Sequence, residues 1–177
     1  MAAYSQESIL KAVRDNGVRF ISLQFTDIMG TVKTITVPTS QLVNVMDNGI
    51  WFDGSSIQGF VRISESDMFL RPDLNTFAII PWLNDSHGTA RFICDVFTPG
   101  GELFVGAPRT ILSRAMDEAR AMGLEYRVGP ELEFFLFGTD ESGAPIPGAT
   151  HDEAGYFDLT ADRGALVRDD MITALEP

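Results

Sequence analysis

Hydrophobic residues recur at helical spacing close to the start of the chain. Ile9, Leu10 and Val13 form one apolar stripe, which predicts an amphipathic helix over residues 5–16. Ser5 precedes the stripe and is the expected N-cap, because its hydroxyl can accept a hydrogen bond from a free amide of the first turn. The chain therefore opens with a short helix that has one face to bury.

The pattern then changes to strand spacing. Apolar and polar residues alternate within residues 18–25, and β-branched residues follow at 31–37 after a turn at 26–30. This pattern is typical of a β-hairpin. Beyond it, residues 39–47 predict a second short helix that is closed by Gly49.

Residues 53–67 have no sustained periodicity and are rich in glycine and serine, which predicts a loop with a short strand inside it. Two further strands are predicted at 75–82 and 90–97, joined by a polar hairpin loop. Together these elements predict a compact α+β domain. Its expected boundary is the turn at residues 98–101.

The second half of the chain has fewer elements. Proline at position 108 begins a predicted helix that Gly123 ends. The other predicted elements are strands at 124–128, 131–137 and 155–159, a loop at 138–148 and a helix at 164–175. Because these elements offer little surface to bury against, we expect them to belong to a larger body.

Composition narrows the classes of protein. The 177 residues include 25 acidic and 13 basic side chains, which gives a net charge of −12. A surface this acidic repels nucleic acid and anionic lipid, so we expect neither nucleic acid nor membrane as a partner. The single cysteine, Cys94, excludes an intramolecular disulfide and fits a reducing compartment. Without a membrane-length apolar run or a signal-peptide pattern, the expected location is cytoplasmic.

Two glutamates stand at the start of a predicted strand in the second half. On a strand, Glu131 and Glu133 point to the same face with Cα atoms about 6.5 Å apart, and the apolar residues up to Phe137 favour burial. Paired buried carboxylates are costly unless arginines or hard cations such as Mg²⁺ or Mn²⁺ neutralise them. The alternative is that the strand end emerges into water and both side chains are solvated.

A second candidate is Asp53, within the FDGSS segment of residues 52–56. It is either the cap of an ordinary turn or a carboxylate that a mobile loop presents next to two hydroxyls. Arg62 follows in the same region, where it either clamps a carboxylate or pairs at the surface with Glu65 or Asp67.

Several segments together resemble bacterial type I glutamine synthetase. These segments, in the order and spacing of the N-terminal part of that family, are LQFTDIMGTVK, FDGSSIQGFVRISESDM, RPDLNTFAIIPW, ARFICDVFTPGG and GPELEFFLF. The resemblance implies an α+β fold class, with a β-grasp domain over residues 1–105 and the beginning of a catalytic α+β domain over residues 106–177. Since family members are well over twice this length, we expect a fragment that is inactive alone.

The resemblance also implies roles for single residues. The family joins ammonia to L-glutamate in nitrogen assimilation, using ATP as a substrate and forming γ-glutamyl phosphate. By resemblance, Glu133 binds the Mg²⁺ or Mn²⁺ ion that contacts glutamate, and Glu131 binds the second ion, which bridges the ATP phosphates. Asp53 matches the aspartate that binds ammonium and takes a proton from it. Ser56 and Arg62 are weaker candidates for substrate binding or regulation.

Finally, the resemblance implies assembly and regulation. Family members form a homo-oligomer, a dodecamer of two stacked hexameric rings, in which Asp53 would serve the site of the neighbouring subunit. The run Phe60-Val61-Arg62 resembles the subgroup that glutamine inhibits directly rather than the adenylylated one. Two alternatives remain: a γ-glutamyl–amine ligase of the same superfamily, and a non-catalytic synthetase-like module that binds a partner. Asp53 favours the ammonia enzyme, because a bulkier amine would not need so small a cation site.

Overall fold

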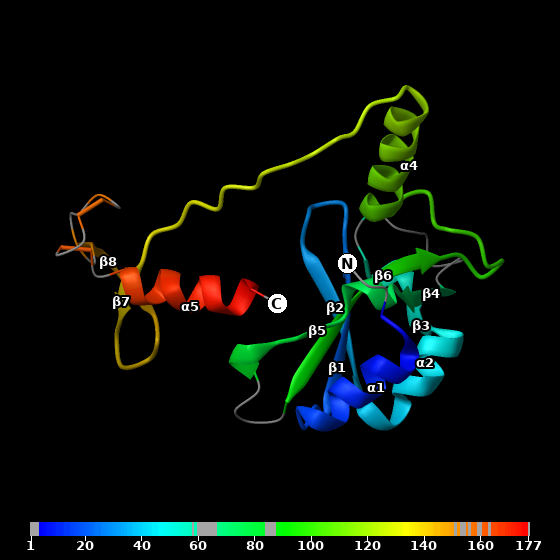
Figure 1. The fold of residues 1–177 in the computed structure, drawn as a ribbon, viewed down its shortest axis with the longest axis horizontal. Helices are drawn as coiled ribbons and strands as arrows, with labels where there is room; N and C mark the ends of the chain where they lie inside the picture. The colour runs from blue at the N-terminus through cyan, green and yellow to red at the C-terminus, as the bar shows by residue number, and fades with distance from the viewer. Residues whose placement is uncertain are drawn as a thin grey trace. The chain divides into compact units, whose positions relative to one another are not determined.

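The computed structural model describes residues 4–57, 59, 67–83, 88–150, 152, 155, 157–158, 161–162 and 164–176. They form two compact units: unit 1, which ends at Tyr126, and unit 2, which begins at Arg127. Figure 1 follows the chain through both units and gives the labels of their helices and strands.

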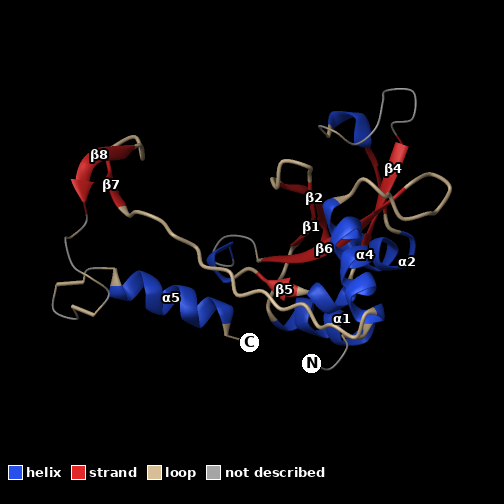
Figure 2. Cartoon of the chain, turned by 90° about the horizontal axis from the view of Figure 1, so that it is seen from above, coloured by secondary structure: helices blue, strands red, loops and turns tan. Residues whose placement is uncertain are grey.

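A mixed six-stranded sheet forms the centre of unit 1 (Figures 1 and 2). Its strands are β1 (Phe20–Thr26), β2 (Val32–Pro38), β3 (Ile50–Asp53), β4 (Asp67–Pro72), β5 (Ala78–Ile79) and β6 (Thr89–Phe97). The order is β2-β1-β6-β4-β3, and β5 also pairs with β6. Only β1 and β6 run parallel to each other; the other pairs of this sheet are antiparallel. The first half of β6 pairs with β1 and β5 and its second half with β4.

The hydrophobic core lies between this sheet and two helices, α1 (Gln6–Asp15) and α2 (Leu42–Asn48), which Figure 2 shows next to the strands. Burial alternates along the central strands, as expected where one face of a sheet packs against helices. The buried core residues of α1, β1, α2 and β6 include Ile9, Val13, Ile21, Leu23, Phe25, Leu42, Val45, Phe92, Cys94 and Val96. Unit 1 is thus a mixed α+β fold with a curled sheet, consistent with a β-grasp domain.

Most of the elements predicted for the first hundred residues are confirmed. Ser5 caps α1 through a capping box, in which its hydroxyl accepts a hydrogen bond from the Ser8 amide at 3.1 Å. Strands β1 and β2 form the predicted hairpin, with Gly30 at φ +81° in its turn. The second helix begins as a 3₁₀ turn (Thr39–Gln41), continues as α2 and ends at Gly49.

The strand predicted over residues 75–82 is wrong for most of its length. The Asp73 carboxylate accepts a hydrogen bond from the Asn75 amide at 3.0 Å and bends the backbone into the 3₁₀ helix η4 (Leu74–Thr76). A second 3₁₀ helix, η5, covers Pro81–Leu83, so only β5 remains extended. A side-chain acceptor at the start of a segment thus competes with sheet pairing.

Beyond the sheet, unit 1 continues through a turn and one more helix. The Gly101 amide donates to the Thr98 carbonyl at 2.9 Å, which closes the turn predicted at residues 98–101. Ala107 is buried in the same core as the sheet, and helix α4 (Pro108–Ala121) begins with proline at its first position, as predicted. The domain boundary at residues 105/106 stays a prediction, while the compact unit extends to Tyr126.

Unit 2 departs most from the sequence-based expectation. The strands predicted at 124–128 and 131–137 are wrong for nearly all of their length, because residues 124–136 belong to no paired strand and the first strand after α4 is β7 (Phe137–Thr139). It pairs with β8 (Pro145–Thr150), so a hairpin stands within the predicted loop at 138–148. Helix α5 (Ala165–Leu175) is confirmed. Of the predicted strand at 155–159, only three residues are described, and the Asp158 amide closes a turn onto the Gly155 carbonyl at 2.9 Å.

The irregular stretch has a simple physical cause. An extended segment becomes a strand only when its backbone amides and carbonyls pair with a neighbour. Among the residues that the structure describes, none forms a ladder with Glu131–Leu136, and Leu132 and Phe135 are 78% and 82% exposed.

In the described part of the chain, no helix has the length and apolar character needed to span a bilayer.

Candidate functional site

Asp53 stands where β3 ends and the short 3₁₀ helix η2 (Gly54–Ser56) begins. Its Oδ1 atom accepts hydrogen bonds from the Ser55 amide at 2.9 Å and the Ser55 hydroxyl at 2.6 Å. The Ser56 hydroxyl lies 3.5 Å from Oδ2, which is long for a hydrogen bond. Oδ1 of Asp53 is therefore hydrogen-bonded within the turn, while Oδ2 has only this long contact within the described chain.

These contacts also fix the charge of Asp53. The Ser55 hydroxyl, followed by the Ser55 amide, lowers the pKa of the Asp53 carboxyl below its ordinary value, because both groups stabilise the ionised form. Asp53 is exposed, so it presents a permanent negative charge to solvent at neutral pH. The chemistry this permits is the attraction of a small cation.

A second aspartate in the chain makes the same kind of turn. In unit 2, Asp140 Oδ1 accepts from the Ser142 amide at 2.8 Å and the Ser142 hydroxyl at 2.6 Å, and its pKa is also lowered, first by that hydroxyl. The hydrogen bonds of Asp53 are therefore those of a common capped turn. What separates Asp53 from Asp140 must lie in its surroundings.

Asp53 shares one face of the sheet with aromatic side chains and a second carboxylate. Trp51, two residues earlier on β3, is 59% exposed, and its ring lies 5.2 Å from that of Phe69. Phe69 in turn stacks on Phe97 at 5.1 Å. Asp67 is the register partner of Asp53 on β4 and is also exposed. This end of the β3–β4 pair therefore carries two exposed carboxylates beside an aromatic surface.

The sequence suggests Asp67 as a surface ion-pair partner of Arg62, whereas in the structure Asp67 lies opposite Asp53 on β4. Strand β4 begins at Asp67 and was not predicted, so its pairing with the end of β3 was not expected. Arg62 and Phe60 lie outside the described residues. Their predicted roles in binding a carboxylate or in regulation stay predictions.

Glu131 and Glu133 belong to unit 2, in the irregular segment that precedes β7. Both side chains are exposed, and neither forms a hydrogen bond or ion pair with another described residue. Because the segment is not a strand here, the expectation that both point to one face has no support in the structure. Across the described residues, no group of three or more histidine, cysteine or acidic side chains gathers as a metal site would require.

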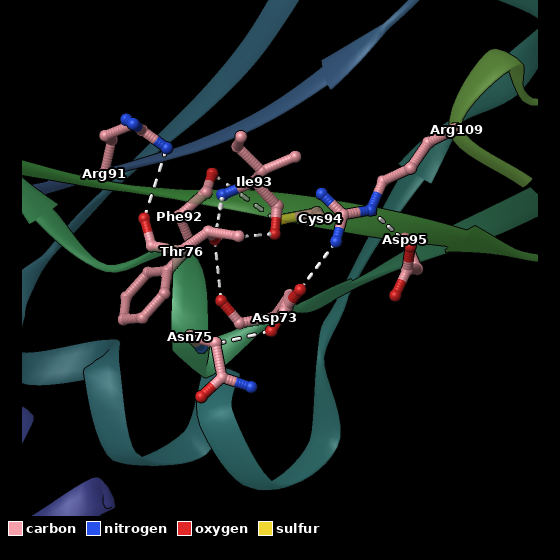
Figure 3. A network of polar contacts seen from close by, with 9 residues as sticks. All are labelled: Asp73, Asn75, Thr76, Arg91, Phe92, Ile93, Cys94, Asp95 and Arg109. Atoms are coloured by element: carbon pink, nitrogen blue, oxygen red, sulfur yellow. Dashed lines mark hydrogen bonds and ion pairs between the residues drawn. The ribbon is translucent and has the colours of Figure 1, made fainter. Parts of the chain in front are cut away.

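A polar network that sequence analysis did not predict joins three elements of unit 1 (Figure 3). Arg109, near the start of α4, donates from Nε to Asp95 at 2.9 Å and from Nη2 to Asp73 at 2.6 Å. The Thr76 hydroxyl donates to the Asp73 carbonyl at 2.7 Å and accepts from the Ile93 amide at 2.8 Å. A single arginine therefore links α4 to β6 and to the turn before β5.

Comparison with known proteins identifies two family matches along the chain. The family described as glutamine synthetase, beta-Grasp domain, matches residues 17–99, and the family described as glutamine synthetase, catalytic domain, matches residues 105–177. Arg109 belongs to the second match, whereas Asp73 and Asp95 belong to the first. The network in Figure 3 therefore connects segments of two families within unit 1.

Similar proteins carry the same name. A glutamine synthetase from Clostridium saccharobutylicum is 52% identical over 177 residues, which covers 99% of this chain and 40% of that protein. One from Staphylococcus aureus strain Mu50 is 48% identical over 175 residues, with 98% and 39% covered. The chain thus spans about 40% of the length of these curated relatives.

Solved structures share the fold. The ADP complex of GmaS aligns with a TM-score of 0.66 at 23% identity, covering 94% of this chain and 37% of that one. Plasmodium falciparum glutamine synthetase aligns with a TM-score of 0.58 at 23% identity, covering 69% and 24%. At these identities the likeness concerns the fold alone.

Proposed function

The chain belongs to the glutamine synthetase family, and from this premise we propose that it forms part of an enzyme that joins ammonia to L-glutamate using ATP, through γ-glutamyl phosphate. The observation that carries the proposal is the match to both family domains together with 52% identity, over the whole chain, to a protein of that name. The FDGSS and GPELEFFLF segments lie within these matches and contain Asp53, Ser56, Glu131 and Glu133.

Asp53 is proposed to bind the ammonium ion. Ammonium is readily captured as a cation, but only neutral ammonia has a lone pair for attack on an acyl phosphate, so the site must both bind the ion and remove a proton. The lowered pKa of Asp53 favours the binding step, because the carboxylate stays ionised, and it makes Asp53 a weak base. Proton removal therefore requires that the pKa of the ammonium ion falls once the ion is bound.

Glu131 and Glu133 are proposed as ligands of divalent cations. Carboxylate oxygens are the donors that Mg²⁺ and Mn²⁺ prefer, and both side chains are exposed and without partners in the described chain. Two glutamates supply fewer oxygens than the roughly six of Mg²⁺ coordination, so the remaining ligands come from other groups. When bound, such ions neutralise the charge of the ATP phosphates during phosphoryl transfer.

A graft tests the proposed activity directly. The 177 residues of this chain replace the matching segment of the Clostridium saccharobutylicum glutamine synthetase, and glutamine formation is measured with and without ammonia and ATP. We expect activity that depends on both substrates and is lost in the Asp53→Asn and Glu133→Gln grafts. A graft that folds and binds ATP yet forms no glutamine would contradict the proposal. An active graft that prefers methylamine to ammonia would favour the γ-glutamyl–amine ligase.

We further propose that the assembled enzyme is a homo-oligomer of two stacked hexameric rings, as the resemblance to the family implies. In it, Asp53 would complete the site of a neighbouring subunit. Grafts carrying only Asp53→Ala and grafts carrying only Glu131→Ala are each expected to be nearly inactive. In rings mixed at equal ratio, random placement restores an intact site with a chance of about ½ × ½, so about a quarter of the activity returns. No recovery in mixed rings confirmed by mass would place Asp53 in the site of its own subunit.

Arg62 and Ser56 are proposed in supporting roles. Arg62 follows Asp53 by nine positions and is proposed to sense a bound carboxylate, so Arg62→Ala should relieve inhibition by glutamine more than it reduces turnover. Ser56 is proposed to orient Asp53 only weakly, because its hydroxyl lies 3.5 Å from the carboxylate. An inhibition curve that Arg62→Ala leaves unchanged would favour the surface ion pair with Glu65 or Asp67.

A further inference from the structure

The turn between β1 and β2 is held by a buried carboxylate that the proposed chemistry does not use. Asp27 is only 3% exposed, and its Oδ1 accepts hydrogen bonds from the amides of Met29 and Thr31, both at 2.9 Å. The Lys33 ammonium lies 3.2 Å from Oδ2. Burial opposes ionisation, but the hydrogen bonds outweigh it and lower the pKa of Asp27. Two hydrogen bonds and an ion pair from one buried carboxylate therefore hold the turn together.

This turn places Ile28 against the backbone beyond Asp53. Gly59 has φ +80°, and a Cβ atom at that position would lie 2.2 Å from Ile28 Cδ1 and 2.9 Å from Ile28 Cγ1. The Ile28 side chain thus occupies the space that a side chain at residue 59 would need. Ile28 is nevertheless 51% exposed, so its role is not that of an ordinary core residue.

A second contact joins the same two parts of unit 1. The ring of Phe25, two residues before Asp27, lies 5.1 Å from the ring of Phe52, which directly precedes Asp53. Strands β1 and β3 are not neighbours, because β6 and β4 lie between them in the sheet. Both contacts therefore depend on the curl of the sheet, and Asp53 lies between two residues, Phe52 and Gly59, that rest on the β1–β2 hairpin.

We propose that Ile28 is a positioning residue that holds the Asp53 segment, defined as residues 53–57 and 59, against the β1–β2 turn. A β-branched side chain suits this role because its few rotamers keep the contact surface in place. The contact itself does not depend on the proposed function. Only its purpose, to hold the Asp53 carboxylate where an ammonium ion binds, rests on the proposed function. The contact also supplies the distinction from Asp140, whose turn has the same hydrogen bonds.

Amide hydrogen exchange on the 177-residue chain tests the contact without any assay of activity. The Ser55 amide donates to Asp53 and the Ile57 amide donates to the Gly54 carbonyl, so both report the shape of the segment. Ile28→Ala is expected to speed their exchange roughly five- to tenfold, and Ile28→Val, which lacks only Cδ1, to speed it less. Exchange along β1 should stay unchanged.

Met29→Ala is the matched control, because Met29 is in the same turn and is 69% exposed. If Ile28→Ala behaves as Met29→Ala does, or if it speeds exchange equally throughout unit 1, the positioning role is overturned. The purpose is then tested in the graft, where Ile28→Ala should raise the KM for ammonium several-fold and leave the KM for glutamate unchanged. Faster exchange with an unchanged ammonium KM would keep the positioning role and refute the assignment of ammonium to Asp53.

Discussion

Both unit 1 and unit 2 contain large hydrophobic side chains, but the two units bury them to very different extents. The buried hydrophobic side chains of the described chain all lie at or before Ala107, and Phe92 is fully buried at 0% exposure. In the described part of unit 2 no side chain is buried, and Phe135 is 82% exposed. Periodicity reports which face an element prefers to bury, whereas burial itself depends on what the element packs against.

The comparison also separates stability from chemistry. In unit 1 the candidate Asp53 stands beside a complete core, so its geometry is set by the fold of its own unit. In unit 2 the candidates Glu131 and Glu133 lie in an irregular, exposed segment. The position of Asp53 is thus set by contacts within unit 1, whereas no side-chain contact with another described residue holds Glu131 or Glu133.

The largest expected effect concerns the core. Phe92→Ala removes a fully buried ring that contacts Phe77 at 5.4 Å, so it should lower the free energy of unfolding by about 3–5 kcal/mol. The matched change in unit 2, Phe135→Ala, should alter it by less than about 0.5 kcal/mol, because an exposed ring loses little. Urea unfolding followed by far-ultraviolet circular dichroism, which senses the backbone of both units, measures both. Equal losses would show that unit 2 buries Phe135 in solution.

The second prediction concerns activity instead of stability, and here the larger effect is expected from a residue of unit 2. Glu131→Gln should leave the free energy of unfolding unchanged within about 0.5 kcal/mol, because the side chain is exposed and has no described partner. If Glu131 is a metal ligand as proposed, this change should lower the activity of the grafted enzyme about 100-fold. Glu141→Gln, an exposed glutamate in the β7–β8 turn, is the control and should retain activity. Activity of Glu131→Gln at the level of this control would favour the solvated glutamate.

The sequence predicted unit 1 well where one local signal decided the structure. The Ser5 cap, the β1–β2 hairpin and the alternation around Phe92 are each contained within a few residues. Strands β3 and β4 were missed because they are short and flank a glycine-rich segment, and their existence depends on pairing between residues distant in sequence. The pairing of Asp53 with Asp67 and the Arg109 network were missed for the same reason.

In unit 2 the error in prediction was the opposite one: strands were predicted that the structure does not form. The ELEFFLF run has a strong strand pattern, yet strands need partners, and the described residues provide none for it. The Asp53 motif was found from its residue types, because the Asx turn it forms is local. Its contact with the β1–β2 turn was not found, because Ile28 and Gly59 are far apart in sequence and glycine leaves no side-chain signal.

The third prediction uses Cys94 as a reporter of the core. Burial, as the main cause, raises the pKa of its thiol from 9.0 to about 12. Because the folded pKa is the higher one, the contribution of the thiol to stability is complete below pH 9 and is lost as pH rises toward 12, at up to about 1.4 kcal/mol per pH unit. Cys94→Ala should flatten this alkaline decline in urea titrations at each pH. An identical slope in both proteins would mean that the thiol ionises freely in the folded state.

A smaller effect is expected from the link between α4 and the sheet. Arg109→Met removes the ion pairs with Asp73 and Asp95, which are about one-third exposed, so we expect a loss of about 1 kcal/mol in the free energy of unfolding. Arg114→Met, an exposed change on the same helix, is the control and should have no effect. The loss should shrink in 1 M salt, where screening weakens charge pairs. A salt-independent loss would assign the role of Arg109 to packing of its aliphatic stem.

The smallest effect compares the two capped turns directly. Ser55→Ala and Ser142→Ala each remove a hydroxyl that donates to an aspartate at 2.6 Å, so the pKa values of Asp53 and Asp140 should both rise toward the ordinary 3.8. Since a lowered pKa contributes stability that is lost as pH falls through it, the variants should be slightly less stable than the native chain above about pH 4, and this difference should disappear as the pH falls below that. Carboxyl-carbon NMR titration measures each pKa separately.

Ile28→Ala then separates the turns. If the β1–β2 turn holds the Asp53 segment, this variant weakens the contact between Ser55 and Asp53 and raises the pKa of Asp53, while the pKa of Asp140 does not change. Asp140 lies in unit 2, and its acceptor atom is served entirely by residues 142–144 of its own hairpin. Equal behaviour of both aspartates would mean that the Asp53 turn is as self-contained as that of Asp140, and that its position owes nothing to Ile28.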